Sequence, residues 1–178
     1  MDLSSISIRS ERLLLRAFAP RDAQEAHAAA TATLARYMSW DPAPSLESFE
    51  QIWRIWRTMM VAGIDAAVAV RLASTGEFLG MAGLHHILRP EPEVGIWIKE
   101  TMHGHGFGRE AVAAVVAFAA AELGKQAVLY PVAEQNLPSR RLAESLGGKL
   151  VGKGTLRKPS GVELAEVIYR IPTGSFPN

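Results

Sequence analysis

The sequence contains no cysteine. This absence excludes disulfide bonds, cysteine-ligated metal and iron–sulfur sites, and any covalent intermediate on a cysteine thiolate. The remaining candidates for metal ligands are four histidines, namely His85, His86, His103 and His105. Neither an HExxH spacing nor a cysteine supports them, so no metal is expected.

An excess of charge and a long apolar run are also missing. The chain carries 19 Lys and Arg against 18 Asp and Glu, a net charge of +1, so nucleic acid is not an implied partner. The longest apolar run, Ala111 to Ala121, is far shorter than the roughly 20 residues of a membrane-spanning helix, and no span is expected. The segment from Met1 to Ser5 lacks a basic region followed by an apolar core, so a cytoplasmic location is the default expectation.

The composition is that of one globular domain. The chain has 178 residues, of which 48% are hydrophobic and 21% charged. That length is enough to bury a substantial core. We therefore expect a single domain over residues 1–178, with a loose tail at 173–178.

The centre of the sequence combines a strand, a glycine-rich turn and a helix. Residues 93–99 fit a strand, and apolar residues recur at helical spacing after Arg109. Between them stand Gly104, Gly106 and Gly108, which leave no Cβ between the backbone N–H groups and a ligand. A helix N-terminus behind such a turn favours an anion, although an ordinary glycine-rich turn accounts for the same residues.

Two common nucleotide motifs do not fit this turn. A dinucleotide fingerprint fails because Arg109 stands where its third glycine is required, and the chain has no Gly-Lys-Ser/Thr of a phosphate-binding loop. The pattern that fits is His103-x-x-Gly106-x-Gly108. It resembles the Gln/Arg-x-x-Gly-x-Gly/Ala loop that binds the coenzyme A pyrophosphate in the GNAT superfamily of N-acetyltransferases.

The resemblance covers most of the chain and is closest to the RimJ/RimL branch, the ribosomal-protein N-terminal acetyltransferases. Besides the central stretch it rests on three segments, at residues 11–16, 78–83 and 136–147. Two residues depart from the family pattern: His103 replaces Gln or Arg, and Gly148 stands where Phe is common.

The resemblance implies an α/β (α+β) fold. It is a mixed, mostly antiparallel central sheet of about six to seven strands flanked by helices, with strands four and five splayed to admit the pantetheine arm. Pro131 lies inside the expected strand 127–133, and because proline cannot donate to a ladder, one edge of that strand must be unpaired there. Both a splayed strand and an ordinary edge strand satisfy this condition.

The remaining elements follow from local patterns. We expect strands at 12–17, 66–72, 78–84, 149–155 and 164–171, and helices from Asp22 to about Tyr37, from Ser45 to Gly63 and over 137–146. The helix after Ser45 carries an apolar stripe, which belongs to the core or to a lid over the acceptor cleft. Its members are Phe49, Ile52, Trp53, Trp56 and Met60.

The resemblance also implies which residues bind acetyl-CoA. The main chain of strand residues Ile96, Trp97 and Ile98 contacts pantetheine and thioester, and Asn136 and Ser139 contact the pantetheine arm. The loop residues that hold the pyrophosphate are His103, Gly104, His105, Gly106, Phe107, Gly108 and Arg109.

Two residues are candidates for catalysis. Glu93 matches the position of a catalytic glutamate in some GNAT enzymes, and an amine acceptor, protonated at neutral pH, needs a base. Ser139 is the candidate proton donor, because Ala143 stands where many GNAT enzymes have a tyrosine that acts as the general acid. The alternatives are a solvated carboxylate at a strand end for Glu93 and a helix cap for Ser139.

Tyr37, Trp40 and His85 are the candidates for the acceptor site, although two aromatics that pack a loop onto the core explain Tyr37 and Trp40 equally well. The predicted function is transfer of an acetyl group from coenzyme A to a primary amine, on a small molecule or a protein N-terminus. Without cysteine, the amine attacks directly. The alternative is a catalytically silent acyl-CoA-binding or regulatory module. The chain is expected to be a monomer or a homodimer.

Overall fold

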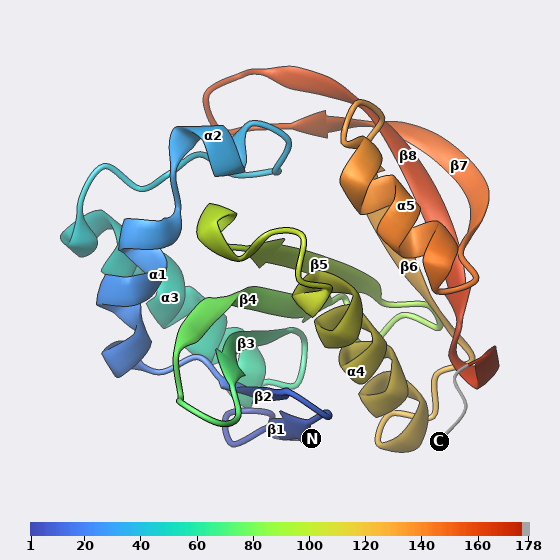
Figure 1. Cartoon of the computed structure of the whole chain (residues 1–178), viewed down its shortest axis with the longest axis horizontal. Coiled ribbons are helices and arrows are strands. Elements are labelled where there is room, and N and C mark those ends of the chain that lie inside the picture. Colours follow the sequence, from blue (N-terminus) through green and yellow to red (C-terminus); the bar gives the residue numbers. More distant parts are fainter. Residues whose placement is uncertain (176–178) are drawn as a thin grey trace.

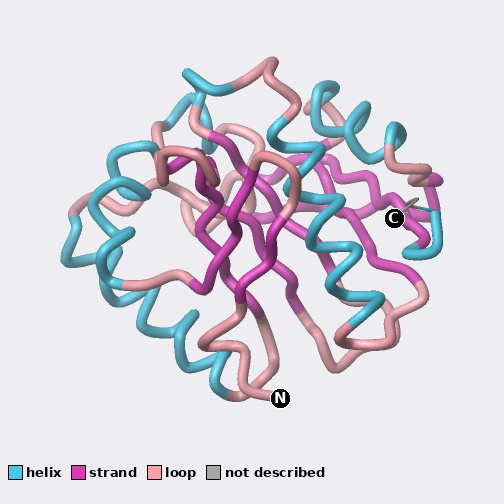
Figure 2. Tube along the Cα trace, turned by 60° about the horizontal axis from the view of Figure 1, so that its bottom comes forward, coloured by secondary structure: helices cyan, strands magenta, loops and turns pink. Residues whose placement is uncertain are grey.

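The computed structural model describes residues 1–175 as one eight-stranded sheet with helices on both faces (Figures 1 and 2). The strand order is β1-β2-β3-β4-β5-β6-β8-β7, and all pairs are antiparallel except β5 and β6. The strands are β1 (Ser7–Arg9), β2 (Leu13–Ala17), β3 (Ala66–Leu72), β4 (Phe78–His85), β5 (Glu93–Ile98), β6 (Ala127–Ala133), β7 (Lys149–Arg157) and β8 (Glu163–Pro172).

Within residues 1–175 the chain also forms five α-helices and three 3-10 turns, of which the last follows β8. The helices are α1 (Ala23–Ala29), α2 (Ala32–Ala35), α3 (Leu46–Val61), α4 (Phe107–Ala121) and α5 (Leu137–Ser145). The 3-10 turns are η1 (Pro20–Asp22), η2 (Glu100–Met102) and η3 (Thr173–Ser175). No helix within residues 1–175 combines the length and the hydropathy needed to cross a membrane.

The two faces of the sheet carry different helices. Strand side chains alternate between faces: Ala66 and Val68 of β3 lie beside Val115 and Phe118 of α4, whereas Ala67 lines a cavity together with residues of α1 and α3. Helix α5 contacts α4 and lies on the α4 face. The cavity described below therefore opens on the α1 and α3 face.

The expected seven strands are all present, and β1 is an eighth strand that the sequence patterns missed. It is three residues long and pairs with β2. A stretch that short contains too little alternation to be recognised. Because of it, the splayed fourth and fifth strands of the expected fold carry the labels β5 and β6.

The splay is visible in the pairing of β5 with β6. The two strands share one register pair, Glu93 with Leu129, where the Leu129 N–H donates to the Pro92 carbonyl over 2.8 Å. On its other edge β6 pairs with β8 along its whole length. Pro131 is two residues beyond Leu129 and so presents the same edge to the gap, where its missing N–H costs no ladder hydrogen bond. Of the two alternatives for Pro131, the splayed strand is the correct one.

The first expected helix is broken, and its start differs from the prediction. It divides into α1 and α2 around Ala30 and Thr31, and the Thr31 hydroxyl caps α2. Asp22 does not cap α1 with its side chain. Its carboxylate is instead fully buried between the guanidinium groups of Arg16 and Arg71.

The second helix agrees with the prediction. Ser45 accepts a hydrogen bond from the Ser48 N–H and caps α3, and Gly63 follows the helix with a φ of 69°. The apolar stripe packs into the core, as the first of the two alternatives predicted, and part of it borders the cavity. Phe49, Trp53 and Met60 are buried in the core, whereas Ile52 and Trp56 line the cavity.

The C-terminal segment continues past β8. The Thr173 N–H donates to the Gln126 carbonyl and its hydroxyl to the Lys125 carbonyl, and residues 173–175 form η3. Thr173 is therefore attached to the segment before β6, and residues 176–178 of the expected tail lie outside the described part of the chain.

Candidate active site

The glycine-rich turn ends in an exposed helix N-terminus. Gly104 and Gly106 have φ values of 80° and 79°, a region in which side chains are strained, and a Cβ at Gly104 would meet no atom within 4 Å. Gly106 is the N-cap of α4 and no side chain caps the helix. The first N–H groups of this 15-residue helix are therefore available to an anion at its positive end.

The side chains of the turn are occupied within the protein. His103 Nε2 lies 2.6 Å from the Ile98 carbonyl oxygen, and His105 Nδ1 lies 2.9 Å from the His103 carbonyl oxygen. Phe107 is buried, and Arg109 donates from Nε to the Ser145 hydroxyl. Among the residues expected to hold a pyrophosphate, this arrangement leaves mainly backbone N–H groups to do so.

Arg12, which the sequence patterns did not single out, supports the turn. Its Nη1 donates to the His105 carbonyl over 3.1 Å, its guanidinium lies 4.6 Å from the centre of the Phe107 ring, and its Nε bonds to Glu110 over 2.7 Å. Burial alone would raise the pKa of Glu110, but hydrogen bonds from the Arg12 N–H, Ser10 and the Arg12 side chain lower it. Because Arg12 and Glu110 are 98 residues apart, local spacing gave no signal for this contact.

The strand residues expected to contact pantetheine divide into two groups. The Lys99 N–H donates to the Leu79 carbonyl of β4, so odd-numbered residues of β5 present their main chain to β4 and even-numbered ones to the gap. Ile96 and Ile98 therefore face the gap, although the Ile98 carbonyl is taken by His103. The Trp97 main chain faces β4 rather than the gap, and the Trp97 side chain lines the cavity.

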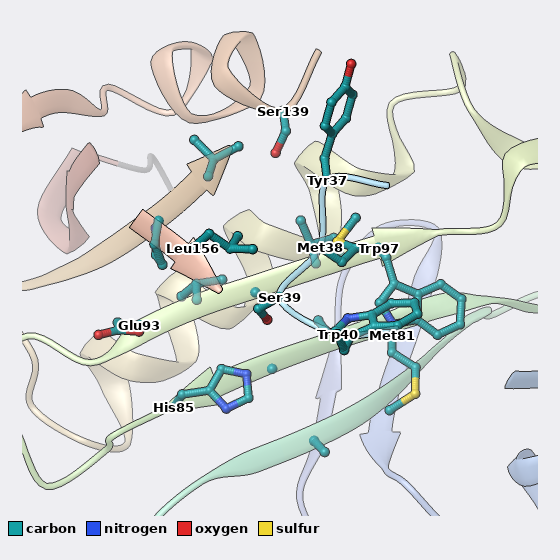
Figure 3. Close-up of a pocket in the computed structure, with 18 of the residues that line it drawn as sticks. Tyr37, Met38, Ser39, Trp40, Met81, His85, Glu93, Trp97, Ser139 and Leu156 are labelled. Carbon is teal, nitrogen blue, oxygen red and sulfur yellow. The ribbon is translucent and has the colours of Figure 1, made fainter. Parts of the chain in front are cut away.

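A cavity of about 520 Å³ extends from the α1 and α3 face into the gap between β5 and β6. Its size is typical of a site for a small ligand. Its walls combine aromatic side chains with a few polar ones, and Figure 3 shows Trp40 and Trp97 at one end and His85 and Glu93 at the other. Asn136 and Ser139 of α5 also line it. The cavity thus joins the gap to an open cleft.

The floor of the cavity contains two paired glycines with an imidazole above them. Gly83 of β4 pairs with Gly95 of β5, and a Cβ would lie 2.5 Å from His85 Nε2 at Gly83 and 3.6 Å from it at Gly95. The other ring nitrogen, Nδ1, lies 3.2 Å from an oxygen of Asp65. His85, expected as an acceptor contact, therefore lines the cavity with Nε2 over the floor, and Asp65 holds its ring.

Two glutamate carboxylates line the cavity, Glu93 beside His85 and Glu166 on β8. Glu93 pairs in register with His85, and its oxygens lie 3.3 Å from Arg89 Nη1 and 3.9 Å from His86 Nε2. Glu166 of β8 lines the same cavity, and burial followed by repulsion from Glu93 raises the pKa of Glu166. No local pattern singled out Glu166, because β8 comes near β5 only in the folded chain.

Ser139 has a buried partner. Its hydroxyl lies 2.8 Å from the hydroxyl of Tyr130, a side chain that is 2% exposed. Burial raises the pKa of Tyr130 to about 12. Asn136 caps α5 by accepting from the Ser139 N–H, as the helix-start alternative predicted, and both residues also line the cavity. Although Ala143 stands at the position of the family's tyrosine, a buried tyrosine on β6 thus contacts Ser139.

Tyr37 and Trp40 both line the cavity from the connection between α2 and α3. Trp40 packs edge-on against Trp97, with ring centroids 6.1 Å apart. Asp41, the next residue, accepts from the Ser160 N–H over 2.9 Å and lies 3.4 Å from Lys158 Nζ. The connection is therefore tied to the β7–β8 hairpin, which reaches across the molecule toward α2 (Figure 1). Within residues 1–175 no cluster of three or more potential metal ligands exists.

Several solved structures have this fold. A GCN5-related N-acetyltransferase from Brucella melitensis is 17% identical with a TM-score of 0.83, over 99% of this chain and 83% of that one. A RimL ribosomal L7/L12 alpha-N-protein acetyltransferase, in complex with coenzyme A, is 16% identical with a TM-score of 0.83, and the match covers 96% of this chain and 100% of that one. RimJ from Mycobacterium smegmatis, in complex with CoA-disulfide, is 18% identical with a TM-score of 0.80, over 93% and 84%. RimJ and RimL are thus among the similar structures, as the sequence resemblance predicted.

The family follows from the sequence comparison. The comparison with curated proteins finds no match. The family model described as the acetyltransferase (GNAT) domain matches residues 12–149. Enzymes of this family use acetyl-CoA, and the uncapped α4 N-terminus, the open space at Gly104 and the gap between β5 and β6 fit that cofactor. The chain belongs to the GNAT acetyltransferase family and is an N-acetyltransferase.

Proposed function

We propose that the enzyme transfers an acetyl group from acetyl-CoA to a primary amine, which attacks directly. The observation that carries the proposal is the gap between β5 and β6, because it connects the exposed N-terminus of α4 with the cavity on the other face. The acceptor is a small molecule or a protein N-terminus, as for the RimL structure, and a cytoplasmic location is part of the proposal.

The chain's own groups would hold acetyl-CoA mainly by main chain. The N–H groups of Phe107, Gly108 and Arg109 meet the pyrophosphate, and Ile96 faces the pantetheine arm across the gap. Acetyl-CoA supplies the thioester carbonyl that the amine attacks. No cysteine is present to take the acetyl group first.

Glu93 is the proposed base. An α-amino group free in water has a pKa of about 7.7 to 8.0, and a lysine amine one of about 10.4, so a bound acceptor arrives as an ammonium. Glu93 lines the cavity at the edge of the gap, within reach of that proton directly or through a water. His85 contacts the acceptor from the floor, and Asp65 keeps its ring in place.

Ser139 is the proposed proton donor to the leaving thiolate. The hydrogen bond between the Ser139 and Tyr130 hydroxyls orients Ser139 at the cavity wall. Tyr130 stays protonated because burial raises the pKa of Tyr130 to about 12. A thiolate leaves without much assistance, so we expect this pair to contribute less than the base.

The cofactor assignment is tested by Gly106→Val with isothermal titration calorimetry. A side chain at Gly106 both strains a φ of 79° and covers the turn, so coenzyme A binding is expected to be lost. Gly124→Val is the matched control, because Gly124 follows the other end of α4 with a φ of 64° and has open space around it. Equal coenzyme A affinity in the two folded variants would overturn the assignment of the turn.

The silent acyl-CoA-binding module is the alternative. Coenzyme A binding by the wild-type chain, followed by no acetyl transfer to any amine in a broad panel, would select it. Acetyl transfer to an amine that depends on Glu93 would reject it.

A further inference from the structure

We propose that the acceptor is a primary amine on an apolar body of aromatic size, without a carboxylate next to the amine. This inference rests on the proposed function and names the class of substrate that the same cavity takes. It follows from how charge and aromatic surface are distributed along the cavity.

The charged side chains that line the cavity are all acidic. They are Asp41, Glu93 and Glu166, and no lysine or arginine of the described chain is among the lining residues. Glu93 is paired with Arg89 and Asp41 with Lys158, so among these three carboxylates only Glu166 has no cation beside it within residues 1–175. A substrate carboxylate would therefore find repulsion and no counter-ion, whereas an ammonium would find an attractive field.

Glu166 is the carboxylate that most clearly lacks a partner. Within residues 1–175 its side chain has no ion pair or hydrogen bond, and it is partly buried beside Glu93. Two carboxylates in one partly buried site repel each other, and a cation between them removes that repulsion. The ammonium group of the acceptor meets this requirement, and it arrives close to the proposed base.

The other end of the cavity is aromatic. Trp97 lies on the same face of β5 as Glu93 and Gly95, and two strand residues span about 7 Å. Trp40 packs edge-on against Trp97, and so does Phe78, with ring centroids 5.9 Å apart. The Tyr37 ring lies apart from them, on the side of Ser139 (Figure 3). When the amino group of an acceptor lies above Gly95, the rest of the molecule can extend either toward Trp97 and Trp40 or toward the acidic end. An apolar group is more stable beside the two tryptophans (Figure 3).

The same features are unfavourable for a polypeptide N-terminus. Each peptide unit brings an N–H and a carbonyl, and burying these groups without partners costs free energy. Besides the indole N–H groups of Trp40 and Trp97, the polar groups near the aromatic end are the Ser39 hydroxyl and the Asp41 carboxylate, which is already paired with Lys158 and the Ser160 N–H. In addition, Asp41 ties this wall to Lys158 and Ser160 of the β7–β8 hairpin, which closes one direction in which a chain could leave.

The test compares amines that differ in one group. Acetyl transfer by the full chain is followed by release of the coenzyme A thiol, for which the absence of cysteine gives no protein background. The probes are 2-phenylethylamine, L-phenylalanine, L-phenylalanine amide and a serine-initiated hexapeptide. We expect kcat/KM for 2-phenylethylamine to exceed that for L-phenylalanine at least about tenfold, with the amide in between, because the carboxylate is the penalised group. L-phenylalanine is expected to be the poorest of the four acceptors, and the hexapeptide the second poorest.

Two variants connect this preference to the residues. Trp40→Ala is expected to raise KM for 2-phenylethylamine about tenfold while changing KM for ethylamine less than about twofold, since ethylamine has no ring to lose its contact. Glu166→Gln is expected to reduce the preference over L-phenylalanine at least about threefold. Glu163→Gln is the control on the same strand, because Glu163 is exposed and paired with Arg157 outside the cavity.

The outcomes separate this inference from the proposed function. Equal or better transfer to L-phenylalanine or to the hexapeptide overturns the substrate class while leaving an active acetyltransferase. The substrate class is also overturned if neither Trp40→Ala nor Glu166→Gln changes the preference for 2-phenylethylamine over L-phenylalanine. Failure to bind acetyl-CoA in calorimetry contradicts the proposed function instead.

Discussion

Asp22→Asn tests the buried charge network that fixes the first helix to the sheet. The Asp22 carboxylate is 0% exposed and accepts from Arg16 Nη1 and Nη2 over 2.9 and 2.7 Å, from Arg71 Nη2 over 2.7 Å, and from the Ala19 N–H over 2.9 Å. Arg71 also pairs with Glu25. The network joins β2 and β3 to the start of α1, which carries the cavity residues Ala26 and His27.

The magnitude follows from what the substitution leaves behind. Removing one partner of a buried pair costs about 3 to 5 kcal/mol, because the other charge stays without its partner. The Arg16 and Arg71 side chains are 18% and 13% exposed, so water screens part of this cost, and we expect the lower end, about 3 kcal/mol. For a chain of this size that corresponds to a fall of about 6 to 12 °C in Tm.

The pH dependence of the unfolding free energy provides a second test with the same variant. Burial alone would raise the pKa of Asp22, but the hydrogen bonds from Arg16, Arg71 and Ala19 outweigh it and lower the pKa below 3.8. A lowered pKa in the folded state contributes stability that is complete above the unfolded pKa of about 3.9 and is lost as pH falls through the folded value. The difference in unfolding free energy between wild type and Asp22→Asn should therefore be constant above about pH 5 and shrink below about pH 4.

The assay is urea unfolding followed by circular dichroism at several pH values. Glu50→Gln is the control, because the Glu50–Arg54 pair is exposed on α3 and such pairs contribute about 0.5 kcal/mol or less. A loss below about 1 kcal/mol for Asp22→Asn would refute the assignment of a buried ionised network. A difference that stays constant down to about pH 2 would show that Asp22 is not the titrating group.

The remaining predictions concern catalysis. Glu93→Gln should lower kcat/KM most at acidic pH, where free amine is scarcest, and a ratio to wild type that is flat across pH would remove Glu93 as the base. Tyr130→Phe should lower kcat about tenfold with coenzyme A affinity unchanged, because it removes the hydroxyl that orients Ser139; a matching loss of affinity in calorimetry would assign Tyr130 to binding instead.

The sequence was informative wherever the signal is local. The strand, turn and helix around Gly106 were predicted because alternation, glycine spacing and helical periodicity all fall within about 30 residues. The cap at Ser45 and the unpaired strand edge at Pro131 were predicted for a similar reason, since each depends on what one residue can donate or accept. The gap itself was implied by the family resemblance. Glycine and proline restrict the backbone by themselves.

The groups that the patterns missed depend on contacts between distant segments. Arg12 reaches Glu110 across 98 residues, and Asp65 reaches His85 from the position just before β3. In each pair a local pattern assigns the residue an ordinary role, such as a strand-end charge. The distinction between a solvated charge and a positioned one appears only after the strands are paired.

The cavity shows why the acceptor was beyond the sequence while the cofactor was not. A pyrophosphate can be bound by N–H groups that nearly every residue has, so a short turn was enough to carry the family resemblance from which acetyl-CoA was predicted. The acceptor end is composed of side chains from separate strands, helices and the 37–41 connection, including Trp40, Trp97 and Glu166. Its preference depends on the relative positions of these groups, because an acidic end and an aromatic end select an amphipathic amine only when one molecule can reach both. The effects of substitutions at Trp40 and at Glu166 on kcat/KM should therefore be coupled for 2-phenylethylamine and additive for ethylamine. A double-mutant cycle measures this coupling directly.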